Sequence, residues 1–417
     1  MTDAARRTAW AVTVTGAVAF VVVAWWQVPW HPVPGGLPRP AAVDTVLSDT
    51  QVARAERYAW WARAWSWSSL AVSLAVACWL GFTRVGATLV GRVRGPWPWR
   101  VLVAVALCAG LGRLATLPFA AAGQQHRLDA GLATQSWPAW AWELAVGLAV
   151  SVLAASVALV VLVGCARRWR TAWPAVAGLL VGGMVLLGSF VYPVLVEPLT
   201  NDFRELPDGE LRSEVLAVAD AEGVPVDEVL VSDASRRTTT LNAYVSGYGS
   251  TRRVVLFDTL LDDADRGEVL SVVAHELAHA RHDDVLVGSV LGALGAATGV
   301  GLLALLLGRR RGRVDPARDP SRPEVVPRVL ALVAVAGLLA SPVQSTISRL
   351  VETRADVDAL AATDDPASFV ALQRRLAVRS LADPTPPAWS QVWFGTHPTL
   401  LERVALARRG AVSSRSR

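Results

Sequence analysis

The sequence of 417 residues contains no lysine, so arginine supplies all 40 of its permanently basic side chains. The three cysteines, Cys78, Cys108 and Cys165, fall inside long apolar runs, which excludes a disulfide framework and a Cys-x-x-Cys metal site. The formal net charge is only +5, and a basic set made of arginine alone indicates compositional bias more than a basic surface. The charge therefore gives no reason to expect a nucleic-acid partner.

Charged residues are also scarce, at 18% of the chain, whereas hydrophobic residues make up 53%. Together with a mean hydropathy of +0.38, this balance argues against a soluble globule and indicates a protein whose solvent is lipid. A helix needs about 20 apolar residues to cross the hydrocarbon core of a bilayer. Runs of about that length predict a multi-pass protein of the cell membrane, and they lie at residues 8–30, 64–82, 101–122, 144–165, 174–196, 285–308 and 329–347.

Tryptophan gathers at the ends of these runs, with Trp25, Trp26 and Trp30 closing the first. An indole ring prefers the boundary between headgroups and hydrocarbon, so the clustering supports the membrane placement. The first run has no small-residue cleavage site before "HPVPGGLPRP" at residues 31–40. We therefore expect it to be a retained anchor and not a signal peptide.

One polar stretch, residues 197–284, is too long for a simple connection and should fold. An apolar period of 3.6 residues follows Asp208 and stops at Gly223, which predicts a helix. From about Asp265 the pattern is helical and free of proline up to Arg309, which predicts one continuous helix that becomes the sixth span. Between these helices, β-branched and aromatic runs predict a small sheet with strands at residues 228–233, 241–249 and 252–261.

The predicted fold class is therefore mostly α: a multi-pass helical membrane protein of about seven transmembrane helices, with a small α+β domain inserted between spans five and six. Spans one to five would occupy residues 1–199, and the insert residues 200–284. Spans six and seven would occupy residues 285–347, and a C-terminal part with a disordered tail would follow at residues 348–417.

Histidine is rare in this chain, yet two of the six histidines stand in "HELAH" at residues 275–279. Residues four apart share one face of a helix, so His275 and His279 can hold one metal ion while Glu276 reaches the same space. A catalytic zinc takes three protein ligands and leaves a position for water, whose proton Glu276 could accept. His282 lies on a different face, and we expect it to be solvated or interfacial.

The third ligand must come from elsewhere in the chain, and "SRLVETRADVDAL" at residues 348–360 can supply it. Glu352 and Asp356 are four apart on a predicted helix that directly follows the seventh span. Spans six and seven would form an up-and-down pair, which returns Glu352 to the level of His275. We expect Glu352 to bind the metal and Asp356 to orient an imidazole through its other ring nitrogen.

Six short motifs follow one another along the chain in the order and spacing of a known family: "YPVLVEPL", "LNAYV", "RRVVLFDTLL", "VVAHELAHARHDD", "SRLVETRAD" and "THPTLLERV". In this respect the sequence resembles the type-1 CAAX prenyl protease family of membrane zinc metallopeptidases, which are gluzincins with a His-Glu-x-x-His motif. The resemblance covers about residues 190–410. It implies one zinc ion per chain, bound by His275, His279 and Glu352, with Glu276 as the general base and Asp356 as the residue that orients an imidazole.

The resemblance also implies roles for residues outside the metal-binding set. Asn242 and Ala243 would lie on an edge strand that aligns a substrate backbone by strand addition. His397 and Arg403 would face the active site and donate hydrogen bonds to an oxyanion, or hold the carboxyl end of the substrate. An alternative for His397 is a turn residue fixed by Pro398.

The leading hypothesis is thus a membrane-embedded zinc metalloendopeptidase that cleaves peptides or membrane proteins, in CAAX-type processing or in quality control. Two alternatives are a catalytically silent membrane scaffold or transporter and a site-2-type intramembrane protease. The latter would need its zinc motif inside an apolar run, whereas Arg281, Asp283 and Asp284 follow the motif here.

The side of the membrane is predicted in two ways. Arginine-rich loops near residues 84–100, 167–170 and 309–313 share one side with the N-terminus, and the positive-inside rule then favours an extracytoplasmic zinc domain. The resemblance instead implies a cytosolic catalytic face, as in eukaryotic relatives, so both orientations stay open.

Overall fold

The structure, a computed structural model, describes residues 2–195, 201–308 and 315–414. Within these residues, seven helices are long and apolar enough to cross a membrane, which confirms the predicted multi-pass helical fold. Each of the seven predicted runs overlaps one of them. The helices are α1 (Asp3–Gln27), α2 (Asp49–Phe82), α4 (Trp97–Asp129), α5 (Trp137–Arg168), α6 (Trp173–Leu195), α10 (Asp284–Leu307) and α11 (Val326–Thr363).

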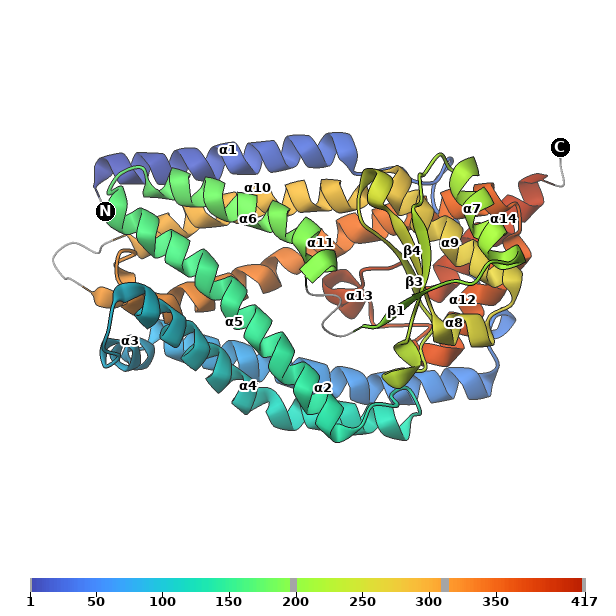
Figure 1. The fold of residues 1–417 in the computed structure, drawn as a ribbon, viewed down its shortest axis with the longest axis horizontal. Helices are drawn as coiled ribbons and strands as arrows, with labels where there is room; N and C mark the ends of the chain where they lie inside the picture. The colour runs from blue at the N-terminus through green and yellow to red at the C-terminus, as the bar shows by residue number, and fades with distance from the viewer. Residues whose placement is uncertain (1, 196–200, 309–314, 415–417) are drawn as a thin grey trace.

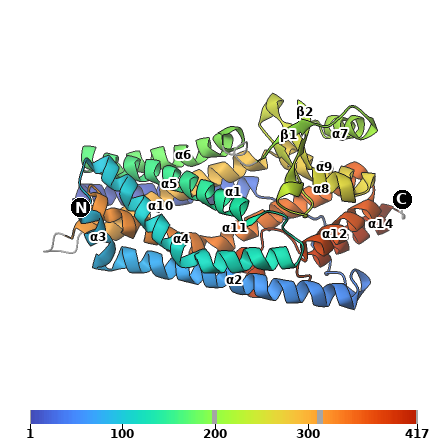
Figure 2. The same cartoon turned by 60° about the horizontal axis from the view of Figure 1, so that its bottom comes forward.

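The spans lie along the long axis of the molecule, with the sheet and the shorter helices gathered at one end (Figures 1 and 2). The N-terminus and the short helix α3 (Arg84–Gly91) lie at the opposite end. There Arg100 pairs with Glu324 at 2.8 Å, and Arg167 donates to the carbonyl of Ser321 at 3.0 Å. Two of the arginine-rich loops therefore lie at the end of the bundle that is remote from the sheet.

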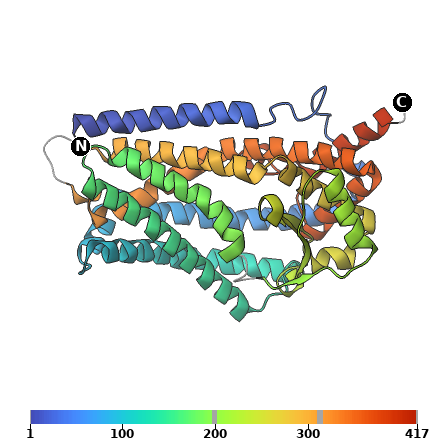
Figure 3. The same ribbon diagram turned by 45° about the horizontal axis from the view of Figure 1, so that its top comes forward.

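Small residues let the helices around α10 approach closely. Helix α1 runs along α10, and α6 follows the same helix (Figure 3). An added Cβ at Gly301 of α10 would collide with Thr13 of α1, and one at Gly182 of α6 would lie 3.0 Å from the carbonyl of Ala293. Close contact through small residues is how helices associate where lipid removes the hydrophobic driving force.

The inserted domain is built on a four-stranded sheet of order β1-β2-β4-β3, one strand more than the sequence predicts. Strands β2 and β4 are parallel, and the other two pairs are antiparallel. The additional strand, β1, has only three residues, too few for an alternating pattern to reveal it. The strands are β1 (Phe203–Glu205), β2 (Glu228–Ser232), β3 (Ala243–Ser246) and β4 (Arg253–Phe257).

Helix α9 (Arg266–Arg281) packs against the sheet, together with α7 (Glu210–Ala221) and α8 (Asp258–Asp263). Asp265 and Glu268 form a capping box that fixes the start of α9, with the backbone N–H of Asp265 donating to Glu268 at 2.9 Å. The apolar side of α9 is buried with residues of β4 in one core, which includes Val273, Leu277, Val254 and Leu256. The sheet therefore supports the helix that carries His275 and His279.

The predicted continuous helix from Asp265 to Arg309 is wrong, because α9 ends at Arg281 and α10 begins at Asp284. Asp283 between them has φ 51° and ψ 37°, the left-handed conformation that aspartate tolerates better than most residues. Its carboxylate accepts a hydrogen bond from Arg252 at 2.7 Å. A contact with a distant part of the chain therefore accompanies the break, which the helical periodicity alone does not reveal.

The C-terminal part begins with the far end of α11, which has 38 residues and extends well beyond the predicted seventh run. It continues with α12 (Pro366–Ser380), α13 (Ala388–Phe394) and α14 (Leu400–Ser414). The tail predicted to be disordered is helical as far as Ser414, and residues 415–417 lie outside the described part of the chain. The predicted boundary at 199/200 also lies outside it.

Candidate metal centre

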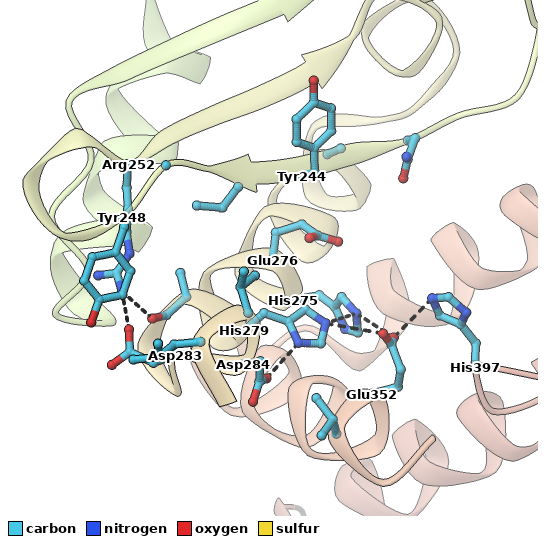
Figure 4. Close-up of a pocket in the computed structure, with 18 residues that line it drawn as sticks. Tyr244, Tyr248, Arg252, His275, Glu276, His279, Asp283, Asp284, Glu352 and His397 are labelled. Atoms are coloured by element: carbon cyan, nitrogen blue, oxygen red, sulfur yellow. Dashed lines mark hydrogen bonds and ion pairs between the residues drawn. The ribbon is translucent and has the colours of Figure 1, made fainter. Parts of the chain in front are cut away.

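Two helices bring the predicted ligands together at the end of the bundle that carries the sheet (Figure 4). Helix α9 presents His275 and His279 one turn apart on the same face. Helix α11 returns from the remote end and presents Glu352 to both imidazoles. The up-and-down pairing of the two last spans thus places a carboxylate from α11 opposite two histidines from α9.

The three side chains lie close enough to share one ion. His275 Nε2 lies 3.2 Å from Glu352 Oε2, and His279 Nε2 lies 3.6 Å from Glu352 Oε1. The two Nε2 atoms are 3.2 Å apart. A tetrahedral zinc with bonds of roughly 2.0–2.2 Å has neighbouring ligand atoms about 3.3 Å apart, so the observed spacing suits such an ion.

The hydrogen bonds around the imidazoles also fit a metal ion. His275 Nδ1 lies 3.0 Å from Asp356 Oδ1, and His279 Nδ1 lies 2.9 Å from Asp284 Oδ2. A proton held on Nδ1 by the carboxylate that it faces leaves the Nε2 of a neutral ring with a lone pair for a metal ion. Oε2 of Glu352 lies 3.2 Å from His275 Nε2 and 3.4 Å from His397 Nε2. A cation between the two imidazoles and this carboxylate would satisfy all three groups.

The electrostatics of His275 lead to the same conclusion. Burial lowers the pKa of His275, but hydrogen bonds to Asp356 and Glu352 outweigh this effect and raise its pKa to about 9. The ion-free cluster therefore attracts a proton near neutral pH. A divalent cation would satisfy the same carboxylates, so metal and proton compete for one place.

Glu276 is adjacent to the first histidine and lines the same pocket. Burial raises its pKa, although the neighbouring imidazoles of His275 and His279 act in the opposite direction. A carboxyl group with a raised pKa is a better proton acceptor than an ordinary glutamate. The position and environment of Glu276 therefore suit a general base.

Arg403 binds the carboxylate of Asp356 beside the first imidazole. Its Nε donates to Asp356 Oδ2 at 2.8 Å, and a second guanidinium nitrogen bonds to the other carboxylate oxygen. Its side chain is 12% exposed and is not among the residues that line the pocket, and one of its guanidinium nitrogens lies 3.5 Å from His275 Nδ1. The guanidinium thus holds the aspartate that faces His275.

His397 does reach the pocket, as expected. It follows α13 in a loop, and its Nε2 lies 3.4 Å from Glu352 Oε2 (Figure 4). Its Nδ1 is 2.9 Å from the hydroxyl of Thr396, and the side chain is 61% exposed. This exposed imidazole beside the metal-ligand candidates is available to a bound molecule, whereas Arg403 is largely buried and paired with Asp356.

Strand β3 forms the opposite wall of the pocket, whose volume is about 440 Å³. Asn242 and Ala243 both line it, as do Tyr244 and Val245. Strand β3 pairs only with β4 in the described sheet, so it is an edge strand, and its residues share the pocket with His275, His279 and Glu352. An extended peptide can add to such an edge by backbone hydrogen bonds.

The far end of the pocket holds residues for which the sequence predicts no role. Arg252 pairs with Asp283 and donates to the carbonyl of Ala280 at 2.8 Å, and its guanidinium lies over the ring of Tyr248 (Figure 4). These contacts join the turn after β3 to the end of α9. Arg252 and Asp283 lie far apart in the sequence, and a contact of this kind leaves no periodic pattern in it. The spacing of residues therefore could not reveal this part of the site.

His282 also has a partner, although the sequence predicts a solvated or interfacial side chain. Its Nε2 lies 2.7 Å from Asp358 Oδ2, about one helical turn from the metal cluster. The pair connects the end of α9 to α11. It lies outside the set of residues that line the pocket.

Metallopeptidases built into membranes are the class of protein to which this fold and cluster point. Residues 205–410 match the model of peptidase family M48. The chain is 30% identical over 306 residues to the uncharacterized metalloprotease YhfN of Bacillus subtilis, an alignment that covers 71% of this chain and 70% of that protein. The chain therefore belongs to peptidase family M48.

Two further similarities concern CAAX prenyl proteases. The chain is 37% identical over 102 residues to CAAX prenyl protease 1 of Saccharomyces cerevisiae, which covers 24% of this chain and 22% of the yeast protein. The crystal structure of Ste24p from S. mikatae superposes with a TM-score of 0.73, over 96% of this chain and 98% of that one. At 19% sequence identity, this match establishes a shared fold.

Proposed function

We propose that the protein is a zinc metalloendopeptidase that hydrolyses peptide bonds at the edge of the membrane, with His275, His279 and Glu352 as metal ligands. One observation carries this proposal: the Nε2 atoms of two imidazoles and the carboxylate of Glu352 converge in the pocket that β3 also lines. Bound there, zinc would supply a Lewis acid that polarises a carbonyl group and makes water more acidic.

The residues of the chain would perform the remaining work. Glu276 would accept a proton from the attacking water and return it to the leaving amine. The exposed His397 would donate a hydrogen bond to the oxyanion that forms on the substrate carbonyl. Asn242 and Ala243 would guide the substrate along β3, and Asp356 would keep His275 oriented.

The surroundings of the pocket support peptide or membrane-protein substrates. Leu286 and Val285 at the start of α10 line the pocket together with Val351 of α11, so apolar residues of both of these helices line part of it. Val285 is 60% exposed. A peptide segment that emerges from the bilayer would pass these apolar residues directly, both in CAAX-type processing and in the quality control of membrane proteins.

The alternatives predict different outcomes. A silent scaffold or transporter needs none of the four core residues, yet His275, Glu276, His279 and Glu352 all line one pocket. A site-2-type protease would carry its metal within the bilayer, whereas here the cluster lies beside a sheet at the end of the spans. The geometry therefore favours an enzyme whose active site is at the membrane edge.

Metal analysis combined with peptide cleavage tests the proposal. Purified protein should contain about one zinc per chain, and Glu276→Gln should retain the metal but lose cleavage of a peptide library by about 10²–10⁴-fold. Asp262→Asn, which changes an exposed carboxylate of α8, is the matched control and should cleave normally. Unchanged cleavage by Glu276→Gln would exclude it as the base.

We propose further that the zinc domain is extracytoplasmic, because two arginine-rich loops, near residues 84–100 and 167–170, lie at the remote end of the bundle. A cysteine introduced at Gly249, beside the pocket, should react with a membrane-impermeant maleimide in intact cells if this orientation is correct. Labelling only after the cells are opened would support the cytosolic orientation instead.

A further inference from the structure

The second imidazole of the cluster has a carboxylate partner for which the sequence gives no signal. His279 Nδ1 lies 2.9 Å from Asp284 Oδ2, and Arg354 bonds to the other oxygen of the same carboxylate. The side chains of Asp284 and Arg354 are only 10% and 19% exposed. These groups are therefore largely removed from water, where a hydrogen bond between charged partners is directional and strong.

The contact exists because the helix is broken. In an unbroken α-helix, two residues five positions apart point about 140° away from each other, so Asp284 would face away from His279. The left-handed Asp283 interrupts the helix between them, and Asp284 becomes the first residue of α10. In that position its carboxylate also interacts favourably with the helix N-terminus. The break thus turns a carboxylate back onto the imidazole.

The arrangement matches the one around the first imidazole. Asp356, held by Arg403, faces His275 Nδ1, just as Asp284, held by Arg354, faces His279 Nδ1. The two pairs come from different elements: α11 supplies Asp356 and Arg354, α14 supplies Arg403, and α10 supplies Asp284. Arg354 and Asp356 lie in α11, in the helical turn that follows Glu352, so this helix contributes one residue to each pair.

We propose that Asp284, supported by Arg354, is a positioning residue for His279: it fixes the proton on Nδ1 and aims the Nε2 lone pair at the ion. This inference rests on the proposed function, because it takes His279 as a metal ligand. Partners of this kind commonly change metal affinity by about 10–100-fold when they are removed. A pair that only joined α10 to α11 would affect the stability of the fold and leave zinc affinity unchanged.

Zinc affinity measured by chelator competition, on full-length protein in detergent, tests the inference. Asp284→Ala should weaken zinc binding about 10–100-fold, and Asp284→Asn should recover much of it, because an amide oxygen can still accept the Nδ1 proton. Arg354→Gln should have a smaller effect, since it leaves the carboxylate in place. The matched control is Asp358→Ala, which removes the equivalent partner from His282 and should bind zinc like the wild type.

The outcomes separate the inference from the function on which it rests. If His279→Ala loses zinc but Asp284→Ala binds it as tightly as the wild type, the positioning role is wrong and the metal site stands. If the wild type binds no zinc, or His279→Ala binds it normally, the proposed metal site itself is wrong. If Asp284→Ala does not fold, Asp284→Asn and Asp284→Leu, which has a similar volume, take its place in the test. The positioning role is supported only when Asp284→Asn binds zinc within threefold of the wild-type affinity and Asp284→Leu binds it at least tenfold more weakly.

Discussion

The Nε2 atoms of His275 and His279 lie 3.2 Å apart, and the Nδ1 atom of each ring faces a carboxylate. Two lone pairs at this distance repel each other unless a cation lies between them or one ring is protonated. The carboxylate of Glu352 lies beside both rings. A cation bound between the rings would remove this repulsion, which supports the proposed metal site.

Replacing Arg403 should damage both stability and metal binding. Asp356 is 1% exposed, and Arg403 is the cation that balances its charge. Arg403→Gln would leave a buried carboxylate without a full charge partner, a change that typically costs about 3–5 kcal/mol. Denaturant unfolding in detergent should therefore show a large loss, accompanied by weaker zinc binding.

The control for this substitution is Arg379→Gln, which breaks a more exposed pair with Asp263. Exposed pairs contribute roughly 0–1 kcal/mol, so this variant should unfold almost like the wild type. Equal stability losses in the two variants would show that Arg403 has no special role beside the metal-ligand candidates.

A proline in β3 should weaken substrate binding without breaking the sheet. Phe257 donates to the carbonyl of Asn242, and backbone pairing alternates along an antiparallel ladder, so the N–H and C=O of Val245 point away from β4. Val245→Pro removes only that outward N–H, as edge strands tolerate. Loss of one backbone hydrogen bond, about 0.5–1.5 kcal/mol, should raise KM for peptides about 2–12-fold with little change in kcat.

Val245→Ala is the control, because it removes more of the side chain than proline does and keeps the N–H. Its KM should stay within about twofold of the wild type. Identical kinetics for the proline and alanine variants would argue against strand addition along β3.

Zinc affinity should depend on pH through His275. Its pKa is raised to about 9 in the ion-free site, so zinc must displace a proton below that pH. The sign follows: as pH rises toward 9, fewer protons compete, and affinity increases by about tenfold per pH unit before it levels off. Asp356→Asn, which removes the strongest influence that raises this pKa, should level off at lower pH. A flat profile in the wild type would contradict the assignment of His275 as a ligand.

The sequence predicts the seven-span fold and the family correctly because both depend on strong local signals. Apolar runs of about 20 residues are decisive on their own. The pairing of the last two spans then follows from chain length, which is why Glu352 could be expected opposite His275 although 77 positions separate them in the sequence.

Features that depend on tertiary contacts could not be predicted in the same way. The break at Asp283 lies in a stretch without proline, and its left-handed conformation accompanies a contact with Arg252. The position of Arg403 beside Asp356 depends on how α14 packs, which the spacing of "THPTLLERV" does not determine. The catalytic and metal-binding roles of the named residues stay predictions, for which the geometry now gives specific distances.

X-ray absorption at the zinc edge of the purified protein tests the central claim most directly. The account predicts one bound zinc with two imidazole nitrogens at roughly 2.0–2.1 Å and oxygen ligands at roughly 2.0–2.2 Å. Glu352→Ala should bind zinc far more weakly or show one oxygen fewer around it. A Glu352→Ala protein that holds zinc as tightly as the wild type, with the same ligands around the ion, would contradict the account.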